Sequence, residues 1–261
     1  MNTDLTFITN EENRNLLERF RVLIKDTRLF DVLVGYFYTS GFHALYKSLE
    51  NTEKIRILVG INTNKQTVEL IQKAKVEQPT LQYSHAEVKE QLEISVTKEI
   101  EESEDSPEVE GGILKFIEWL KNGKLEIRAY PTENIHAKVY IMTFVEGDRD
   151  IGRVITGSSN FTQSGLIDNF EFNVELKTRA DYEFALQKFN ELWKDAVDVK
   201  ERYIDTIQIK TWLNNTITPY ELYLKFLYEY FKDELSQADE VFLNYIPQEF
   251  KKLAYQEQAV L

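Results

Sequence analysis

Two strand-and-helix units follow one another early in the chain, and this order limits the possible folds most strongly. Residues 31–39 (DVLVGYFYT) and 54–60 (KIRILVG) are short apolar runs rich in β-branched and aromatic residues, a pattern typical of buried strands. A break at Ser40-Gly41 and the helical pattern FHALYKSLEN follow the first run, and a helix is predicted within 64–75 after the second. Strands that alternate with helices favour a sheet built with right-handed crossovers. We therefore expect an α/β domain.

The rest of this domain is predicted from periodicity. An amphipathic helix at 11–26 should lie on the sheet, since it places these residues at helical spacing: Leu16, Leu17, Phe20, Leu23 and Ile24. A helix ending at Gly123 is predicted for 111–123. Four strands are then predicted at 124–130, 136–144, 153–160 and 170–177. A final helix at 180–197 has an apolar face that we assign to the core: Phe184, Leu186, Phe189, Leu192 and Trp193.

The composition of the sequence changes near residue 216. The segment TPYELYLKFLYEYFKDELS is rich in tyrosine and phenylalanine and predicts an amphipathic helix. We therefore expect a mixed β-sheet flanked by helices in residues 1–200, and a helical extension or linker in residues 201–261.

Composition excludes several classes of protein. The chain is 43% hydrophobic and 29% charged, as in globular domains, and no run approaches the roughly 18 apolar residues of a membrane-spanning helix. The start, MNTDLTFITNEENRN, has no signal-peptide or transit-peptide pattern, so a cytoplasmic location is expected. With no cysteines and three histidines, we expect no disulfides, no metal site and no cofactor.

The net charge of −13 argues against a nucleic-acid partner, because binding phosphates needs a basic surface. However, residues 86–110 hold ten acidic and two basic side chains. We interpret this block as a solvated acidic insertion. The remaining chain is only mildly acidic.

A histidine and a lysine share one face of the predicted strand 136–144. Strand alternation puts His136 and Lys138 on one side with Tyr140, roughly 7 Å apart along the strand. An imidazole can attack phosphorus, and a nearby ammonium group can neutralise a phosphate oxygen. The alternative is an ordinary polar pair on a strand.

Two later segments carry further polar groups. TGSSN provides the hydroxyl of Ser158 and the amide of Asn160, at the same strand parity, and a glycine at 157 that lets the backbone approach an anion; an ordinary Gly-Ser turn is the alternative. In FEFNVELK the phenylalanines share an apolar face expected to be interior. Glu171 on the other face should pair with a histidine ring, whereas Glu175 is interpreted as solvated.

In this order and spacing, H-x-K, G-S-x-N and N-x-E resemble the HKD signature of the phospholipase D superfamily, and GSSNFTQSGL is similar to its bacterial nuclease branch. The matching residues are His136, Lys138, Gly157, Ser158, Asn160, Asn169 and Glu171. The family usually has an aspartate seven residues after the first histidine, where this chain has Thr143. That aspartate is generally structural, so its replacement is expected to be tolerated.

The resemblance implies a metal-independent phosphodiesterase. Family enzymes use two H-x-K motifs around one phosphate, so this chain, with one, is expected to form a homodimer acting on nucleic acid, DNA in particular. The implied catalytic residues of each subunit are His136, Lys138, Ser158, Asn160 and Glu171. A non-catalytic nucleic-acid-binding module is the alternative, favoured by Thr143 and by the acidic charge, and phospholipid hydrolysis is a weaker one.

The final residues add one further expectation. FKKLAYQEQAV resembles the stretch that precedes the ATP-binding motif of superfamily 2 helicases, although no GxxxxGK[ST] follows. We therefore expect a phospholipase-D-like domain that leads into a helicase domain of a restriction or repair protein. An ordinary terminal helix is the alternative.

Overall fold

The chain divides into two compact units, Met1–Thr216 and Ile217–Leu261. The computed structural model describes residues 6–11, 15–35, 37–60, 106–130, 135–148, 150–198 and 207–245, with isolated positions between 94 and 104 and at 204. The helix predicted within 64–75 and the helicase-like segment 250–260 lie outside the described residues. Both therefore stay predictions.

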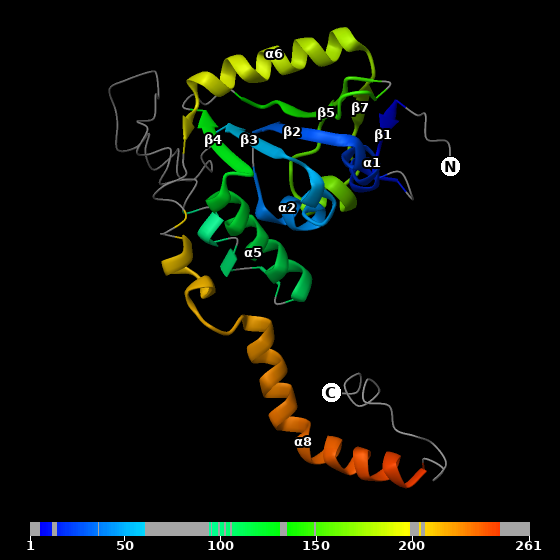
Figure 1. Ribbon diagram of the computed structural model, residues 1–261, viewed down its shortest axis with the longest axis vertical. Helices are drawn as coiled ribbons and strands as arrows, with labels where there is room; N and C mark the ends of the chain where they lie inside the picture. Colours follow the sequence, from blue (N-terminus) through cyan, green and yellow to red (C-terminus); the bar gives the residue numbers. More distant parts are fainter. Residues whose placement is uncertain are drawn as a thin grey trace. The chain divides into compact units, whose positions relative to one another are not determined.

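An eight-stranded sheet forms the centre of the first unit, in the order β1-β7-β6-β5-β2-β3-β4-β8 (Figure 1). β2, β3 and β4 are parallel, and the remaining neighbours pair antiparallel. The expected mixed α/β sheet is thus confirmed. The strands are β1 (Phe7–Ile8), β2 (Thr27–Val34), β3 (Lys54–Gly60), β4 (Leu125–Tyr130), β5 (Lys138–Phe144), β6 (Gly152–Gly157), β7 (Asn173–Leu176) and β8 (Val197–Asp198).

Helices cover both faces of this sheet (Figure 1). One face packs against α1 (Leu16–Leu23), α2 (Thr39–Leu45) and α5 (Pro107–Asn122), and the other against α6 (Arg179–Asp195). Short helical turns are η1 (Ile24–Asp26), η2 (Ser48–Asn51), η3 (Ser164–Asp168) and η4 (Trp212–Asn214). In the second unit the described part is α8 (Pro219–Tyr245). None of the helices in the described ranges combines the length and apolar character that a bilayer crossing requires.

Several predicted elements are confirmed and others shift. All five apolar residues of the opening helix are buried, β3 has the predicted bounds, and Gly123 ends α5. β2, in contrast, begins at Thr27 and ends at Val34, and α2 begins at Thr39. The predicted break at Ser40-Gly41 is therefore wrong. Gly41 lies inside α2, where an added Cβ would lie 2.5 Å from the Phe161 carbonyl oxygen, so tight packing explains the glycine.

The prediction for residues 170–177 is partly wrong. β7 includes only the second half of this segment, and the expected interior phenylalanines are exposed, Phe170 by 71% and Phe172 by 56%. Glu175, expected in solvent, is only 1% exposed. The reason is α1, whose Arg19 donates two hydrogen bonds of 2.6 and 2.8 Å to this carboxylate. A buried carboxylate is tolerated when a cation pairs with it.

Two other interpretations also change. Within the acidic block, Val96 and Ile100 belong to the main core and Glu110 is 6% exposed, so the block is not simply a solvated insertion. The sequence did not predict the burial of these positions because most of their neighbours in the chain are charged. In the final helix, Phe189 is buried as expected, but Phe184 is 64% exposed, because it lines an open groove between α6 and the sheet.

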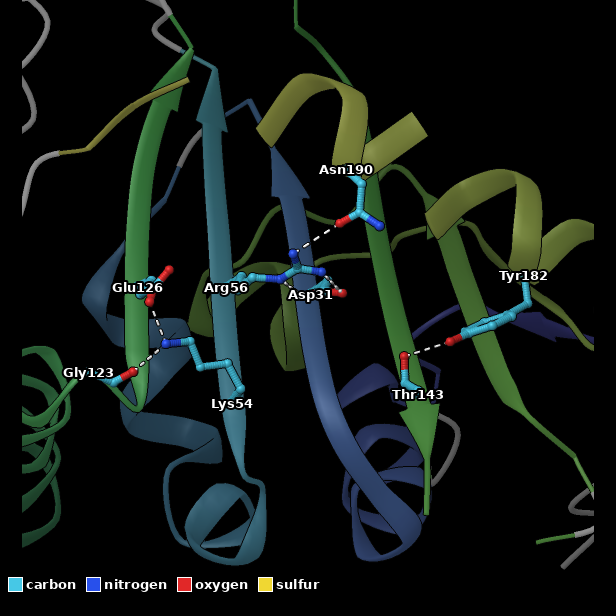
Figure 2. Close-up of polar contacts among 8 residues, drawn as sticks. All are labelled: Asp31, Lys54, Arg56, Gly123, Glu126, Thr143, Tyr182 and Asn190. Atoms are coloured by element: carbon cyan, nitrogen blue, oxygen red, sulfur yellow. Dashed lines mark hydrogen bonds and ion pairs between the residues drawn. The ribbon is translucent and has the colours of Figure 1, made fainter. Parts of the chain in front are cut away.

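A buried ion pair joins the two central parallel strands to α6 (Figure 2). Arg56 of β3 donates hydrogen bonds of 2.6 and 2.7 Å to Asp31 of β2, and a third of 3.0 Å to Asn190 of α6. Burial raises the pKa of the Asp31 carboxyl, and the Arg56 guanidinium opposes this rise. The pair thus holds a charged carboxylate inside the sheet.

Removing the cation of this pair should be costly. Arg56→Met leaves the Asp31 carboxylate buried without its partner, so we expect a loss of about 3–5 kcal/mol in the free energy of unfolding by urea titration. The double variant Arg56→Met/Asp31→Asn should recover part of this loss, because no charge then remains buried. Additive losses in the double-mutant cycle would show that the two groups do not interact.

A partly buried histidine should make the fold sensitive to acid. Burial of His43 on α2 lowers its pKa from 6.5 to about 4, and its Nε2 has no hydrogen-bond partner among the described residues. The unfolded chain therefore binds a proton that the folded chain excludes, and stability falls as the pH falls below 6.5. Between pH 7 and pH 5 the loss should be about 2 kcal/mol. This loss of stability should be absent in the His43→Gln variant. The measurement is urea titration of both proteins at both pH values.

Candidate active site

His136 and Lys138 lie together where β5 begins. Lys138 is the first residue of the strand, and its Nζ donates a hydrogen bond of 3.1 Å to the His136 carbonyl oxygen. The expectation that His136 belongs to the strand is wrong, because it precedes β5 and is exposed. The two residues nevertheless stay adjacent, with the lysine ammonium folded back toward the histidine backbone.

Ser158 and Glu171 come together across the gap between β6 and β7. The Ser158 hydroxyl donates a hydrogen bond to the Glu171 carboxylate and accepts one of 2.9 Å from the Phe172 amide. The Ser158 amide in turn donates to the Phe172 carbonyl oxygen at 3.2 Å. β6 ends at Gly157, so Ser158 and Asn160 lie in the following loop and not at the expected strand positions. Glu171 is thus fixed by Ser158.

Asn160 provides a polar group without a partner in the same loop. Its Oδ1 atom is buried and has no hydrogen-bond partner among the described residues. A buried amide group left unsatisfied costs free energy, and such groups in folded proteins often bind a ligand or water. The Asn160 backbone is held by the Thr162 amide, which donates to its carbonyl oxygen at 2.9 Å.

The register of the sheet brings the His136–Lys138 pair and the Ser158–Glu171 pair to one end of the sheet. Val139 of β5 lies opposite Thr156 of β6, so the start of β5 lies beside the end of β6. The buried Tyr140 hydroxyl bridges them by donating to the Ser159 carbonyl oxygen at 2.8 Å. Burial, and then the nearby negative charge of Glu171, raises the pKa of Tyr140 well above its usual value. The tyrosine therefore stays protonated and donates this bond permanently.

Sequence reasoning missed the residues that support the loop. Ser159 is fully buried, its amide donates to Asn173 Oδ1 at 3.3 Å, and Asn173 Nδ2 donates to its Oγ at 2.8 Å. Asn173 and Tyr140 thus hold Ser159 from two strands. In the sequence, these residues look like any other residues of an alternating strand pattern. Only their contacts across the sheet could have identified them.

Glycines make room for the site. The sequence suggested that Gly157 lets the backbone approach an anion. A Cβ at this position would lie 2.3 Å from the Phe172 carbonyl oxygen, so the glycine is needed for the close approach of β7. A Cβ at Gly60, the last residue of β3, would lie 2.7 Å from the Ile135 carbonyl oxygen. Gly60 therefore sets the path of the segment that carries His136.

Thr143, which stands where the family has an aspartate, lies away from these groups. Its hydroxyl lies 2.7 Å from the Tyr182 hydroxyl of α6 (Figure 2). By strand alternation it faces α6, whereas Lys138 and Tyr140 have the opposite parity. The threonine thus joins β5 to α6 and is separated from the candidate site.

No group of three or more histidine, cysteine, aspartate or glutamate residues with the arrangement of a metal site occurs in the part of the chain that the structure describes. The groups gathered at this end of the sheet are an imidazole, an ammonium, a hydroxyl, an amide and a carboxylate. Such a set can bind phosphate oxygens and supply a nitrogen nucleophile.

A protein-family model described as "Cardiolipin synthase, PLD-like domain" matches residues 23–193, which is more than half of the chain. The chain therefore belongs to the phospholipase-D-like (PLD-like) domain family. The matched range contains β2 to β7 and all five candidate residues. Membership of this family indicates a phosphodiesterase.

Three solved structures have weak similarity to the chain. Nuc, a phospholipase D family member from Salmonella typhimurium, is 15% identical with a TM-score of 0.39, over 69% of this chain and 88% of Nuc. NucT from Helicobacter pylori is 14% identical with a TM-score of 0.39, over 74% and 97%. The archaeal chromatin protein TrmBL2 is 16% identical with a TM-score of 0.37, over 73% of this chain and about half (52%) of TrmBL2. No curated protein sequence matches the chain.

The role of Gly60 can be tested by NMR. Gly60→Ala should displace residues 135–136, because a Cβ would lie 2.7 Å from a backbone oxygen, and should lower the free energy of unfolding by about 1–3 kcal/mol. With three histidines in the chain, the imidazole resonances should be separable, and we expect that of His136 to move while that of His43 stays. Gly111→Ala on α5 is the control. An unchanged His136 resonance in Gly60→Ala would show that the contact has no influence on the site.

Proposed function

We propose that this protein hydrolyses phosphodiester bonds in nucleic acid, DNA in particular, without a metal ion and through a phosphohistidine intermediate. The observation that carries the proposal is the convergence of Lys138, bound to the His136 backbone, with Ser158, bound to Glu171, at one end of a PLD-like domain. These groups have complementary tasks around a phosphate. The imidazole attacks, and cationic and hydrogen-bonding groups stabilise the charge that develops on the oxygens.

The chain has a single H-x-K motif, so we propose that two copies share one active site. His136 of one subunit attacks phosphorus and the bond to the leaving oxygen breaks, while the partner subunit's His136 gives that oxygen a proton. The same partner histidine then takes a proton from water, which attacks the phosphohistidine and releases the nucleophile. Lys138 and Asn160 of both subunits bind the non-bridging oxygens.

Glu171 and Ser158 act as positioning residues in this proposal. The Glu171 carboxylate accepts a hydrogen bond from the Ser158 hydroxyl, so its position is fixed relative to the loop that carries Asn160. A carboxylate held in this way can orient an imidazole in the tautomer that attacks phosphorus. Ser158 thereby connects the phosphate-binding loop to the group that orients the histidine.

Nucleic acid is proposed over phospholipid because none of the described helices combines a basic polar face with the apolar face needed to lie on a membrane surface. The alternative of a binding module rested on Thr143 and on the acidic charge of the chain. The hydrogen bond of Thr143 to Tyr182, on the α6 side of the sheet, favours catalysis, because the replaced position is structural.

The proposal is tested by cleavage of single-stranded and duplex DNA. His136→Ala should reduce the rate by about 10³-fold or more, because it removes both the nucleophile and the general acid. Wild-type activity should persist in EDTA. Binding of DNA, measured by fluorescence anisotropy, should survive the substitution, since Lys138 remains.

Several outcomes would contradict the proposal. Cleavage that stops in EDTA, or that continues in His136→Ala, excludes the histidine mechanism. Wild-type protein that binds DNA but never cleaves it is a binding module. Hydrolysis of phospholipid vesicles without DNA cleavage would identify a lipid substrate.

A further inference from the structure

The loop between β6 and β7 carries three of the five candidate residues, and a side chain from the start of the chain binds it at two points. We call residues 158–171 the site loop. Asn10 lies two residues after β1. Its Nδ2 atom donates a hydrogen bond of 2.9 Å to the Gly165 carbonyl oxygen and one of 3.0 Å to the Asn169 carbonyl oxygen. One amide group therefore joins the middle of the site loop to the residue at which it turns toward β7.

The Asn10 side chain can make these contacts in one orientation only. Its Oδ1 atom accepts a hydrogen bond of 2.8 Å from the Leu16 amide, at the start of α1. Exchanging the side-chain oxygen and nitrogen would place the oxygen against two carbonyl oxygens and the nitrogen against an N–H group. The side chain therefore links the site loop to α1 through three hydrogen bonds that use both hydrogens of its amide.

The backbone of Asn10 has a conformation that few side chains adopt. Its φ of 59° lies in the left-handed region, and within the ranges that the structure describes no other non-glycine residue has a positive φ. Asparagine tolerates this region better than most residues, but glycine adopts it at no steric cost. Such conformations are concentrated at functional sites, where surrounding contacts maintain them. Here the three side-chain hydrogen bonds are those contacts.

Gly165 transmits the position of Asn10 to Asn160. A Cβ at Gly165 would lie 2.6 Å from the Asn160 carbonyl oxygen and 3.2 Å from the Asn160 amide nitrogen, so the two backbone segments are in direct contact. The carbonyl group of the same glycine is bound by Asn10. A displacement of Gly165 would therefore move Asn160, whose side chain is proposed to bind a phosphate oxygen.

The segment around Asn10 also holds Glu171. The Glu171 amide donates a hydrogen bond of 3.4 Å to the carbonyl oxygen of Thr9, the neighbour of Asn10. Asn169, whose carbonyl group Asn10 binds, lies two residues before Glu171. The Glu171 carboxylate is fixed by Ser158 at the other end of the site loop. The position of this carboxylate thus depends on both ends of the loop.

We propose that Asn10 is a positioning residue, which aligns Asn160 and Glu171 through the two carbonyl groups that it binds on the site loop. The inference rests on the proposed function for the tasks of Asn160 and Glu171, and it assigns to one residue outside the motifs the alignment of both. Loss of the two bonds should displace the phosphate-binding amide and the carboxylate that orients the histidine. A displacement of about 1 Å in an active site lowers the rate by up to about 100-fold.

Two variants of Asn10 remove the bonds to the site loop in different ways. Asn10→Asp keeps an oxygen for the Leu16 amide and places a carboxylate against two carbonyl oxygens. Asn10→Gly keeps the left-handed backbone and removes the side chain. Each variant should lower kcat for DNA cleavage by about 10- to 100-fold, because the loss of the loop bonds is common to both. KM should change by less than about threefold, since Lys138 still binds the phosphate.

The matched control is Asn122→Asp, which makes the same change of charge. Asn122 also accepts a hydrogen bond from a backbone amide, that of Lys124, at 2.9 Å. It precedes β4, and the register places the start of β4 at the opposite end of the sheet from Lys138. This variant should cleave DNA at the wild-type rate.

The kinetic outcomes that contradict the inference are specific. Circular dichroism identifies the variants that fold, and a wild-type kcat in either folded Asn10 variant would overturn the inference. Lower stability in urea together with a wild-type kcat would show that Asn10 has a structural role alone. A loss confined to KM, or an equal loss of kcat in Asn122→Asp, would also overturn it.

NMR signals of the site loop separate this inference from the proposed function. The backbone amide signals of Asn160 and Glu171 should shift in both Asn10 variants and stay in Asn122→Asp, because neither amide is itself bonded to the Asn10 side chain. Wild-type protein that cleaves no DNA refutes the proposed function, and these signals then decide the inference by themselves. Shifted signals support the positioning role, and unshifted signals overturn it, even if kcat falls.

Discussion

The ion pair between Asp31 and Arg56 is the contact on which the arrangement of the sheet depends. The two residues lie directly opposite each other in the parallel pair β2–β3, so a shift of one residue would separate two buried charges. The Arg56 guanidinium also lies 4.9 Å from the ring centroid of Phe189 and 5.5 Å from that of Trp193. One cation therefore fixes both the strand register and the position of α6 (Figure 2).

This register is transmitted to the candidate site through β5. Val34 at the end of β2 lies opposite Lys138, so the central strand determines where the H-x-K segment begins. Gly60 at the end of β3 leaves space for the preceding residues, and the antiparallel pairing of β5 with β6 brings Ser158 alongside. The site is thus assembled from strand ends whose alignment is decided in the core, and the loop after β6 is held by a buried hydrogen bond from Tyr140.

The same architecture leaves part of one sheet face uncovered. α6 covers the centre of its sheet face, where Asp31 and Arg56 lie, and leaves the β1–β7 end open. That end contains Phe172, whose backbone holds Ser158.

The sequence by itself determined the α/β class, the opening helix, the bounds of β3 and the family to which the chain belongs, because periodicity and motif order are local properties. The proposed roles of the motif residues rest on that order and await experiment. Only the tertiary structure decided that Glu175 is buried, that Phe172 is exposed and that Ser159 supports the loop. Burial on an outer strand depends on which helix reaches it: Arg19 of α1 covers Glu175 on one side, while α6 stops short of Phe172 on the other.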